Sequence, residues 1–279
     1  MANNRFNVFL NKKISPFDKI IVVDPDKSLS IRSILIGSIS QNISTAKNVL
    51  ESLDVKSAIS SCRKLGVKIN KVNHGHYKIF GKGLGSLFIK KNSVLNFGNS
   101  GTLARLLIGI LATTPDINVN LKGDHSLNKR SMKKLIYLMN NFGTNFFPKK
   151  KFTFPIKMVS SKFPIGIKYI AGVSAQLKSA VILAGLNSYG KTQIVEKEKS
   201  RDHTENILIG NNQAIKIKAK KNNIIEVLGK KQLKPIFINI PGDPSSAAFF
   251  VSLTLLCKGS KIKIKNVGMN PTRMGFYKI

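Results

Sequence analysis

The chain is organised around one stretch, residues 98–111, which reads Gly98-Asn99-Ser100-Gly101-Thr102-Leu103-Ala104-Arg105-Leu106-Leu107-Ile108-Gly109-Ile110-Leu111. A polar turn with two glycines runs directly into apolar residues at helical spacing, which predicts a helix over 101–112 with a buried face. Glycine lets the backbone approach a ligand closely, and the free N–H groups of a first helical turn suit an anion. The same pattern is also typical of a capped core helix. Its recurrence elsewhere in the chain favours the anion site.

Similar helix starts recur at a regular interval along the sequence. They lie near Ser28, Gly101, Ser174 and Ser245, and the intervals between them are 73, 73 and 71 residues. Glycines at 66, 143 and 210 are expected to end the second helix of each pass. A period of about 72 residues with matching internal order predicts a duplicated strand–helix–strand–helix–strand unit. We therefore expect an α+β fold whose units gather around shared cores.

Local patterns predict the individual elements, and Ser126 is expected to cap the helix that follows Arg130. The predicted helices are 28–39, 55–65, 132–141, 174–186, 200–210, 245–256 and a helix from 270 onward. The predicted strands are 6–10, 20–23, 67–69, 76–80, 86–89, 117–121, 191–196 and 260–265.

The charge of the chain is extreme, with a formal net value of +33 from 46 basic and 13 acidic residues. Lysines are spread along most of the chain, whereas five of the seven arginines stand in the polar stretches discussed here: Arg32, Arg105, Arg130, Arg201 and Arg273. The rigid guanidinium fork suits phosphate and carboxylate. Nucleic-acid-binding proteins usually carry aromatic residues interleaved on a basic stripe, and this sequence shows no such pattern. The pattern favours a small anionic ligand, and a basic nucleic-acid-binding protein is the alternative.

The composition is that of a globular protein, with 279 residues, 42% hydrophobic residues and a mean hydropathy of −0.02. No apolar run reaches the roughly 18 residues of a membrane span, and the N-terminus has no signal-peptide core. A cytoplasmic, monomeric protein is expected. Cys62 and Cys257 show no metal-ligand spacing with the four histidines, so neither a metal nor a cofactor is expected.

Several helix starts carry cations or hydroxyl groups where the helix dipole favours anions, and this pattern needs a ligand to explain it. They include Lys27-Ser28 with Arg32, Lys129-Arg130, Ser174-Ala175-Gln176-Leu177-Lys178 and Ser200-Arg201-Asp202-His203-Thr204-Glu205. Each alone is also typical of a solvated basic turn or an N-cap. Ser200, Asp202 and His203 are too close along one helical turn to converge as a catalytic triad. Jointly, the starts predict a site for a ligand with several phosphates or carboxylates.

Seven stretches occur in the order and at the spacing of one family. They are Asp26 to Arg32, Gly98 to Thr102 with Arg105, Gly123 to Arg130, Ser174 to Ala180, Ser200 to Glu205, Pro241 to Ala248 and Asn270 to Arg273. Over residues 24–279 the chain thus resembles the 5-enolpyruvylshikimate-3-phosphate synthases, or 3-phosphoshikimate 1-carboxyvinyltransferases. The resemblance implies an enolpyruvyl transferase-like fold of two domains, each of three units, with substrates between them. It implies one complete domain over 25–241, while residues 1–24 and 242–279 belong to an incomplete second domain.

The resemblance also implies the reaction of this family, which belongs to aromatic amino-acid biosynthesis. The enolpyruvyl group of phosphoenolpyruvate is added to the 5-hydroxyl of shikimate 3-phosphate, and phosphate is eliminated. The residues implied for shikimate 3-phosphate are Lys27, Ser28, Arg32, Ser174, Ala175, Gln176 and Ser200, with Ser28 and Arg32 on the phosphate ester. Those implied for phosphoenolpyruvate are Lys27, Gly101, Arg130 and Gln176. Lys27 and Arg130 would neutralise charge on the leaving phosphate, and Lys27 is the one catalytic candidate.

The chain departs from the family pattern in two ways. Ser131 stands where the family usually has proline. The chain is also expected to be truncated at its C-terminus, because the family's acid–base carboxylates lie in segments beyond residue 279. We therefore expect weak binding of shikimate 3-phosphate and little or no turnover by this chain alone. An enzyme completed by a separate C-terminal fragment, a catalytically dead binding remnant and a nucleic-acid binder are the competing hypotheses.

Overall fold

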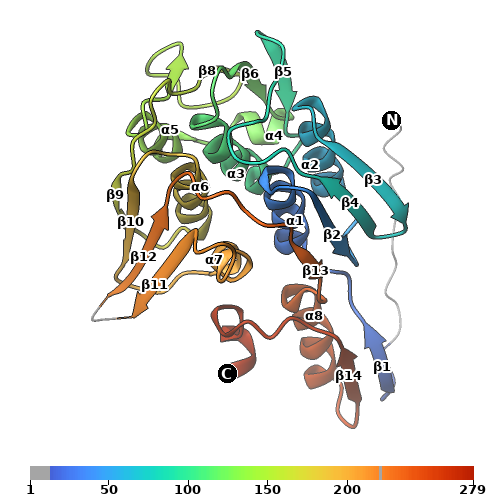
Figure 1. The fold of residues 1–279 in the computed structure, drawn as a ribbon. Helices are drawn as coiled ribbons and strands as arrows, with labels where there is room; N and C mark the ends of the chain where they lie inside the picture. The colour runs from blue at the N-terminus through green and yellow to red at the C-terminus, as the bar shows by residue number, and fades with distance from the viewer. Residues whose placement is uncertain (1–12, 220–221) are drawn as a thin grey trace.

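The computed structural model describes residues 13–219 and 222–279. Figure 1 shows three sheets around a bundle of helices, with a smaller part attached below them. The helices are α1 (Lys27–Ile39), α2 (Leu53–Lys64), α3 (Gly101–Ala112), α4 (His125–Asn128), α5 (Lys133–Asn140), α6 (Ala175–Leu186), α7 (His203–Leu208) and α8 (Pro244–Leu256). Two short 3-10 helices, η1 (Pro271–Arg273) and η2 (Gly275–Lys278), follow near the end of the chain.

Three four-stranded sheets share one arrangement of strands. In each, one parallel pair is extended by two antiparallel strands. The first sheet has the order β13 (Phe237–Asn239), β2 (Ile43–Lys47), β4 (His76–Phe80) and β3 (Lys68–Asn73). The second has β5 (Ser93–Asn96), β6 (Asn118–Lys122), β8 (Ile156–Val159) and β7 (Asn145–Phe147). The third has β9 (Lys168–Ala171), β10 (Lys191–Glu196), β12 (Asn223–Leu228) and β11 (Ile215–Ala219).

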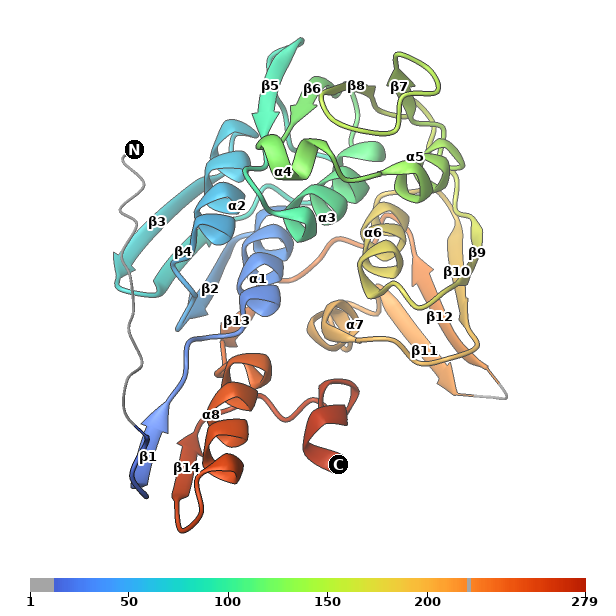
Figure 2. The same cartoon turned by 180° about the vertical axis from the view of Figure 1, so that it is seen from behind.

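Helices α1, α3 and α6 form the centre of the molecule and lie side by side between the sheets (Figure 2). Each is apolar around most of its circumference, so nearly every residue after its first turn is buried. Helices α3 and α6 approach closely at Gly109, where a Cβ atom would lie 2.5 Å from the carbonyl oxygen of Ala180. This close contact fixes the first turns of the two helices relative to one another.

A smaller part is built from both ends of the described chain. Strand β1 (Asp18–Val22) pairs in parallel with β14 (Lys261–Lys265), and α8 packs beside them (Figure 1). Helix α8 is strongly apolar, yet only Pro244 and Ala247 of its residues are buried. Its Leu256 is 87% exposed, so one apolar face of α8 is uncovered in the described structure.

Most predicted helices are confirmed within a few residues, and the helix over 101–112 has the bounds expected for it. Gly66, Gly143 and Gly210 adopt positive φ after α2, α5 and α7, which confirms the predicted helix stops. The single helix expected over 132–141 is preceded by a separate short helix, α4. Asp124 caps α4, since its carboxylate accepts the Leu127 N–H at 2.8 Å. Ser126 lies within α4, and the prediction that it caps the helix after Arg130 is wrong, because the N-cap of α5 is Met132, which makes no side-chain cap hydrogen bond.

Strand predictions were less accurate than helix predictions. The strand expected at 86–89 is wrong, because this segment packs Phe88 over Gly66 and lies outside every sheet. The strand expected at 6–10 lies outside the described residues. Eight strands were missed: β2, β5, β7, β8, β9, β11, β12 and β13. Most are short and mix lysine or serine with apolar residues, so their pairing partners rather than their composition make them strands.

Candidate active site

The first turns of α1, α3 and α6 and the loop before α7 surround one hollow region of the surface. One side chain caps each of the helices α1, α3 and α6. Asp26 accepts the Leu29 N–H at 2.8 Å, Ser100 accepts that of Leu103 at 3.3 Å, and Ser174 accepts that of Leu177 at 3.4 Å. One cap satisfies only one of the orphan N–H groups of a first turn. The remaining N–H groups make these helix starts suitable for anions.

Two cavities adjoin in this region and share Thr102 and Gln176. The larger, of about 1170 Å³, is lined by four predicted residues: Lys27, Gly101, Arg130 and Gln176. The smaller, of about 450 Å³, is lined by six: Ser28, Arg32, Ser174, Ala175, Gln176 and Ser200. All nine residues singled out from the sequence therefore line these two neighbouring cavities, and Gln176 lines both.

Two arginines converge over Gly101 in the larger cavity. A Cβ atom at this position would lie 2.9 Å from the NH1 atom of Arg105 and 3.3 Å from that of Arg130. Burial, and secondarily the charge of Arg130, lowers the pKa of Arg105. Arg130 is held by Asn99, whose Oδ1 accepts its NH2 at 2.9 Å. Two nearby cations at a helix start are a favourable setting for a carboxylate or phosphate.

Gln176 joins the two cavities. Its Oε1 accepts the NH1 of Arg105 at 2.9 Å, and its Nε2 donates to Thr102 Oγ1 at 2.9 Å. Its side chain is thereby held across the starts of α3 and α6. Lys27, at the start of α1, forms a 2.9 Å ion pair with Asp54. The Lys27 side chain is 48% exposed, so this pair is weak and a bound anion can compete for the ammonium group.

Arg32 lies beneath the smaller cavity and is only 4% exposed. It donates to Thr204 Oγ1 at 2.8 Å, to the Ser28 carbonyl oxygen at 3.1 Å and to Ser179 Oγ at 3.1 Å. Burial lowers its pKa to about 10, so the guanidinium stays charged at neutral pH. These bonds use three of its five N–H groups, and two remain for a ligand.

Ser200 is fixed by a buried carboxylate. Its backbone N–H and its hydroxyl both donate to Glu196 Oε1, at 3.2 Å and 2.9 Å. Lys178 pairs with Glu196 at 2.7 Å and with Glu205 at 2.6 Å, and all three side chains are at most 1% exposed. Burial raises the pKa of Glu196, but hydrogen bonds from Lys178, Asn223 and Ser200 outweigh it, and the net pKa shift is downward. For Ser200 to donate to a phosphate, its hydroxyl must leave Glu196.

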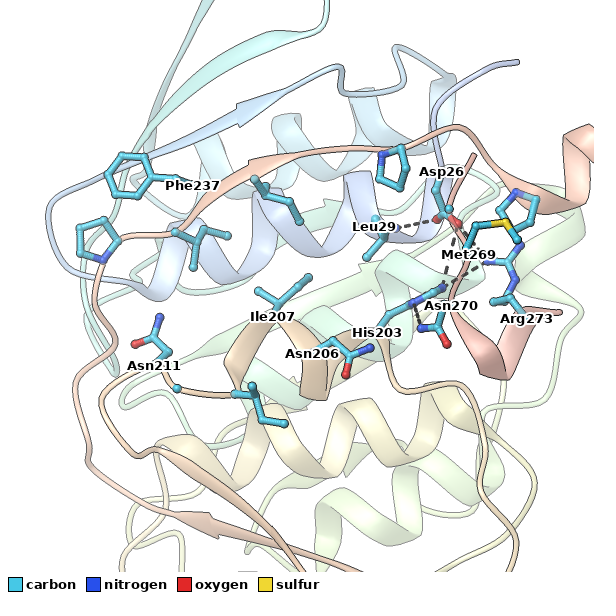
Figure 3. A pocket seen from close by; sticks show the side chains of 18 of the residues that line it. Asp26, Leu29, His203, Asn206, Ile207, Asn211, Phe237, Met269, Asn270 and Arg273 are labelled. Atoms are coloured by element: carbon cyan, nitrogen blue, oxygen red, sulfur yellow. Dashed lines mark hydrogen bonds and ion pairs between the residues drawn. The ribbon is translucent and has the colours of Figure 1, made fainter. Parts of the chain in front are cut away.

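A third cavity, of about 620 Å³, opens on the other side of His203 and contains none of the predicted residues (Figure 3). Its walls are mainly apolar and include Leu29, Ile207, Phe237 and Met269. Polar groups at its end belong to a cluster around Arg273 that also separates it from the smaller cavity. The polar groups of this cluster have partners within the protein.

Comparison with known proteins gives a consistent result. Residues 11–279 match the family model described as EPSP synthase (3-phosphoshikimate 1-carboxyvinyltransferase). The chain belongs to the EPSP synthase family. It is 38% identical over 257 residues to the 3-phosphoshikimate 1-carboxyvinyltransferase of Jannaschia sp. (strain CCS1), covering 91% of this chain and 57% of the relative. It is 39% identical over 267 residues to the 3-phosphoshikimate 1-carboxyvinyltransferase of Novosphingobium aromaticivorans, covering 95% of this chain and 60% of the relative.

A solved structure supports the same conclusion about the fold. The EPSP synthase of Acinetobacter baumannii matches with a TM-score of 0.83 and 34% identity, over 95% of this chain and 59% of that one. The fold is thus the α+β fold of EPSP synthases over that share of their length. The chain spans about three fifths of the length of the EPSP synthases it matches.

Several residues of this candidate site were not selected from the sequence. Arg105 was noted as a motif residue but not as a site residue, although it lines the larger cavity. Lys178 was likewise noted only as a motif residue. Glu196 was missed because nothing in its sequence neighbourhood shows that it meets Lys178 beneath Ser200. Asp54 and Asp124 are the carboxylates that line the two cavities in the described part of the chain. Asp54 is paired with Lys27, and Asp124 accepts the Leu127 N–H.

Proposed function

We propose that this chain binds shikimate 3-phosphate and phosphoenolpyruvate in the two adjoining cavities, as part of a 3-phosphoshikimate 1-carboxyvinyltransferase. The observation that carries the proposal is the division of residues between the cavities. Apart from Lys27, the residues assigned to shikimate 3-phosphate line the smaller cavity, and those assigned to phosphoenolpyruvate line the larger one. Gln176, assigned to both substrates, lines both cavities.

The larger cavity suits a small dianion. Arg105 and Arg130 approach it from the start of α3 and the end of α4, and Lys27 lies on its α1 side. Arg130 and Lys27 would stabilise the negative charge that grows on the departing phosphate. Gln176 would hold the ligand between Arg105 and the neighbouring substrate.

The smaller cavity suits a phosphate ester on a polar ring. Arg32 offers two unused N–H groups from below, and the start of α6 offers the N–H groups of Ala175 and Gln176. Ser28 and Ser174 add hydroxyl groups at the rim. The shared wall at Gln176 would bring the 5-hydroxyl of the ring close to the phosphoenolpyruvate in the larger cavity.

The domain organisation is proposed on the same basis. Residues 25–241 would form one domain of three repeated units with a period of about 72 residues, one for each four-stranded sheet. Residues 1–24 and 242–279 would belong to the second domain of the family. The uncovered apolar face of α8 supports this assignment, since the rest of such a domain would bury it.

Turnover is expected to be low in this chain by itself. General acid–base catalysis needs a titratable side chain within reach of the reacting atoms, and the family is expected to use carboxylates. Asp54 and Asp124 are engaged by internal partners, as described above, and His203 is held by Asn270 at 3.2 Å. A steady-state assay with both substrates is expected to give a rate far below that of a full-length relative. Turnover at an ordinary rate would show that acid–base groups lie within these residues.

The experiment that tests the proposal is a calorimetric titration of the purified chain at physiological salt. Shikimate 3-phosphate is expected to bind, and Arg32→Met is expected to abolish binding. Lys122→Met removes a lysine from β6 that lines neither cavity and serves as the control for charge. A DNA duplex titrated in parallel tests the nucleic-acid alternative. Tight DNA binding without shikimate 3-phosphate binding would reject the proposal.

A second experiment separates an incomplete enzyme from a dead binding remnant. The chain is combined with a polypeptide that supplies the part of the Novosphingobium relative that it does not match. Activity restored on mixing would favour an enzyme completed by a separate fragment. Tight binding of substrates with no activity in the mixture would favour a binding remnant.

A further inference from the structure

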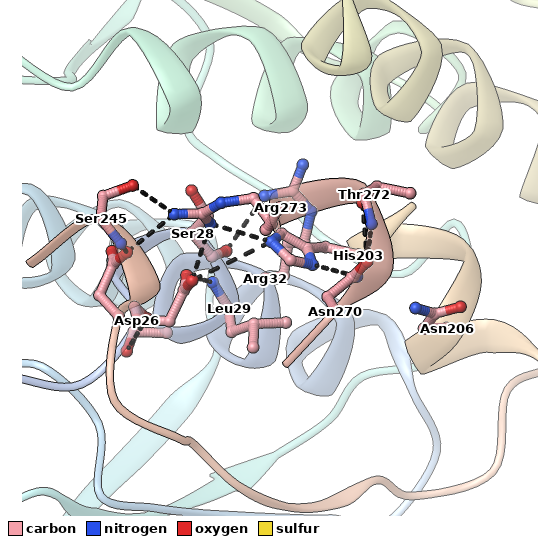
Figure 4. Close-up of polar contacts among 12 residues, drawn as sticks. Asp26, Ser28, Leu29, Arg32, His203, Asn206, Ser245, Asn270, Thr272 and Arg273 are labelled. Carbon is pink, nitrogen blue, oxygen red and sulfur yellow. Dashed lines mark hydrogen bonds and ion pairs between the residues drawn. The ribbon is translucent and has the colours of Figure 1, made fainter. Parts of the chain in front are cut away.

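Arg273 is shared between the N-caps of two long helices (Figure 4). Its NH1 donates to Asp26 Oδ2 at 2.9 Å, and its NH2 donates to Asp243 Oδ1 at 2.8 Å. Asp26 caps α1 and Asp243 caps α8, each by accepting a backbone N–H of its own first turn. The Arg273 side chain is 4% exposed, and that of Asp26 is 2% exposed. One buried cation therefore balances the charge of both cap carboxylates.

Arg273 also spans the two connections between the larger and the smaller part of the molecule. The Asp26 N–H donates to the Pro241 carbonyl oxygen at 2.8 Å, and the Asp243 N–H donates to that of Asp24 at 2.8 Å. The two connections thus run side by side, and the guanidinium group links the residue that follows each of them. Arg273 therefore joins the two connections where they enter α1 and α8.

The cluster directly adjoins the candidate site. Lys27 and Ser28 are the first two residues of α1 after Asp26, and Lys27 lines the larger cavity while Ser28 lines the smaller one. Thr272, next to Arg273, lines the same cavity as Ser28. We propose that Arg273 is a positioning residue, which holds Asp26 and thereby orients Lys27 and Ser28 toward the two cavities. This inference rests on the proposed function, because only bound substrates give that orientation a role.

The chemistry of arginine explains why this residue type is needed. The planar guanidinium fork presents N–H groups in two directions, so one side chain reaches Asp26 and Asp243 together. A lysine would keep the positive charge but present a single ammonium group. Arg273→Lys therefore removes the link while leaving the charge in place, and it is the informative variant.

Amide hydrogen exchange tests the positioning role without any substrate. The Leu29 N–H is bonded to Asp26, whereas the Leu103 N–H is bonded to Ser100, an N-cap without an arginine. In Arg273→Lys we expect exchange of the Leu29 amide to accelerate about tenfold and that of the Leu103 amide to be unchanged. Equal changes in the exchange rates of the two amides would overturn the inference, whether or not the chain binds a substrate.

Substrate titration tests the link to Lys27 and Ser28. Arg273→Lys is expected to weaken binding of shikimate 3-phosphate about tenfold, with no further loss in a Lys27→Met, Ser28→Ala background. In an Arg130→Lys background, Arg273→Lys is expected to cause its full loss of about tenfold in shikimate 3-phosphate affinity. Arg130 follows α4 rather than α1, so Arg273 does not orient it. Independent, additive effects with Lys27 and Ser28 would contradict positioning. If the wild-type chain binds no shikimate 3-phosphate, the proposed function fails, and amide exchange still decides the role of Arg273.

Discussion

Gly101 provides space for two guanidinium groups at the start of α3. The sequence suggested that its missing side chain makes room for a ligand, whereas the nearest atoms to a Cβ there belong to Arg105 and Arg130. A side chain at this position would therefore act through the arginines that are proposed to hold phosphoenolpyruvate.

Gly101→Ala is expected to weaken phosphoenolpyruvate binding about tenfold, because the added methyl group displaces both guanidinium groups. Affinity for shikimate 3-phosphate is expected to change little. Isothermal titration with each substrate measures both effects. Gly172→Ala is the control, since a Cβ at Gly172 meets nothing within 4 Å. Unchanged phosphoenolpyruvate affinity in Gly101→Ala would show that the two arginines need not converge.

Lys178 is a second residue whose importance depends on its surroundings. Lys178→Met leaves the buried carboxylates of Glu196 and Glu205 without their shared cation. We expect a loss of about 3–5 kcal/mol in the free energy of unfolding, measured by urea denaturation. Lys191→Met removes a 51% exposed lysine from its ion pair with Glu226 and is expected to cost less than about 1 kcal/mol. Similar losses in the two variants would mean that burial does not matter here.

At the scale of secondary-structure elements, the contact between α3 and α6 determines the geometry of the site. Both helices begin at the cavities, and Gln176 on α6 is bonded to Thr102 and Arg105 on α3. The helices are held together one to two turns further along, at Gly109. A change at that contact should therefore reach the site without altering any residue that lines it.

Gly109→Ala is expected to destabilise the fold by about 1–3 kcal/mol, because the new methyl group would meet the backbone of Ala180 at 2.5 Å. It should also weaken phosphoenolpyruvate binding by moving Gln176 away from Arg105. Thermal unfolding and titration measure the two effects. Gly37→Ala on α1 is the matched control, since its Cβ would meet a flexible Ile79 methyl group at 3.0 Å, and a smaller loss is expected. A Gly109→Ala protein as stable as the Gly37→Ala protein would contradict this account of the interface.

At the scale of the whole molecule, the smaller part is attached to the larger one through a charged and largely buried cluster. His203 belongs to this cluster and lies 3.2 Å from Arg273 NH1 and 4.0 Å from Asp26 Oδ2. Among the described residues, no helix is long and apolar enough to cross a lipid bilayer. Because a titratable histidine lies in the cluster, we expect the stability of the protein to depend on pH.

Burial lowers the pKa of His203 to about 4 from a usual value of 6.5, and the charges of Arg32 and Arg273 add to this effect. Between these values the unfolded chain binds a proton that the folded chain does not. Stability is therefore expected to fall as the pH decreases from 6.5 to 4, by up to about 3 kcal/mol. Urea denaturation across this range measures the slope. His203→Gln should flatten it, whereas His74→Gln, at an exposed position, should not. A wild-type slope in His203→Gln would contradict the assignment.

The sequence by itself predicted most of the helices and their stops, and it singled out nine residues that line the two cavities. Helix 101–112 and the stop at Gly66 depend on contacts within a few residues, and such local signals are legible along the chain. The arginines stood out because few residue types bind phosphate in this way. Short strands such as β2 and β13 were not predicted, because their pairing joins segments about 190 residues apart.

Only the tertiary structure decided how these parts meet. It grouped the site residues into two cavities, placed Glu196 beneath Ser200 and paired Arg273 with Asp26, which lies 247 residues away in the sequence. It also showed that Gly101 accommodates arginines. The physical reason is that hydrogen bonds and ion pairs of buried groups depend on distances of a few ångströms in space. Sequence spacing does not specify those distances once a chain has passed through several turns.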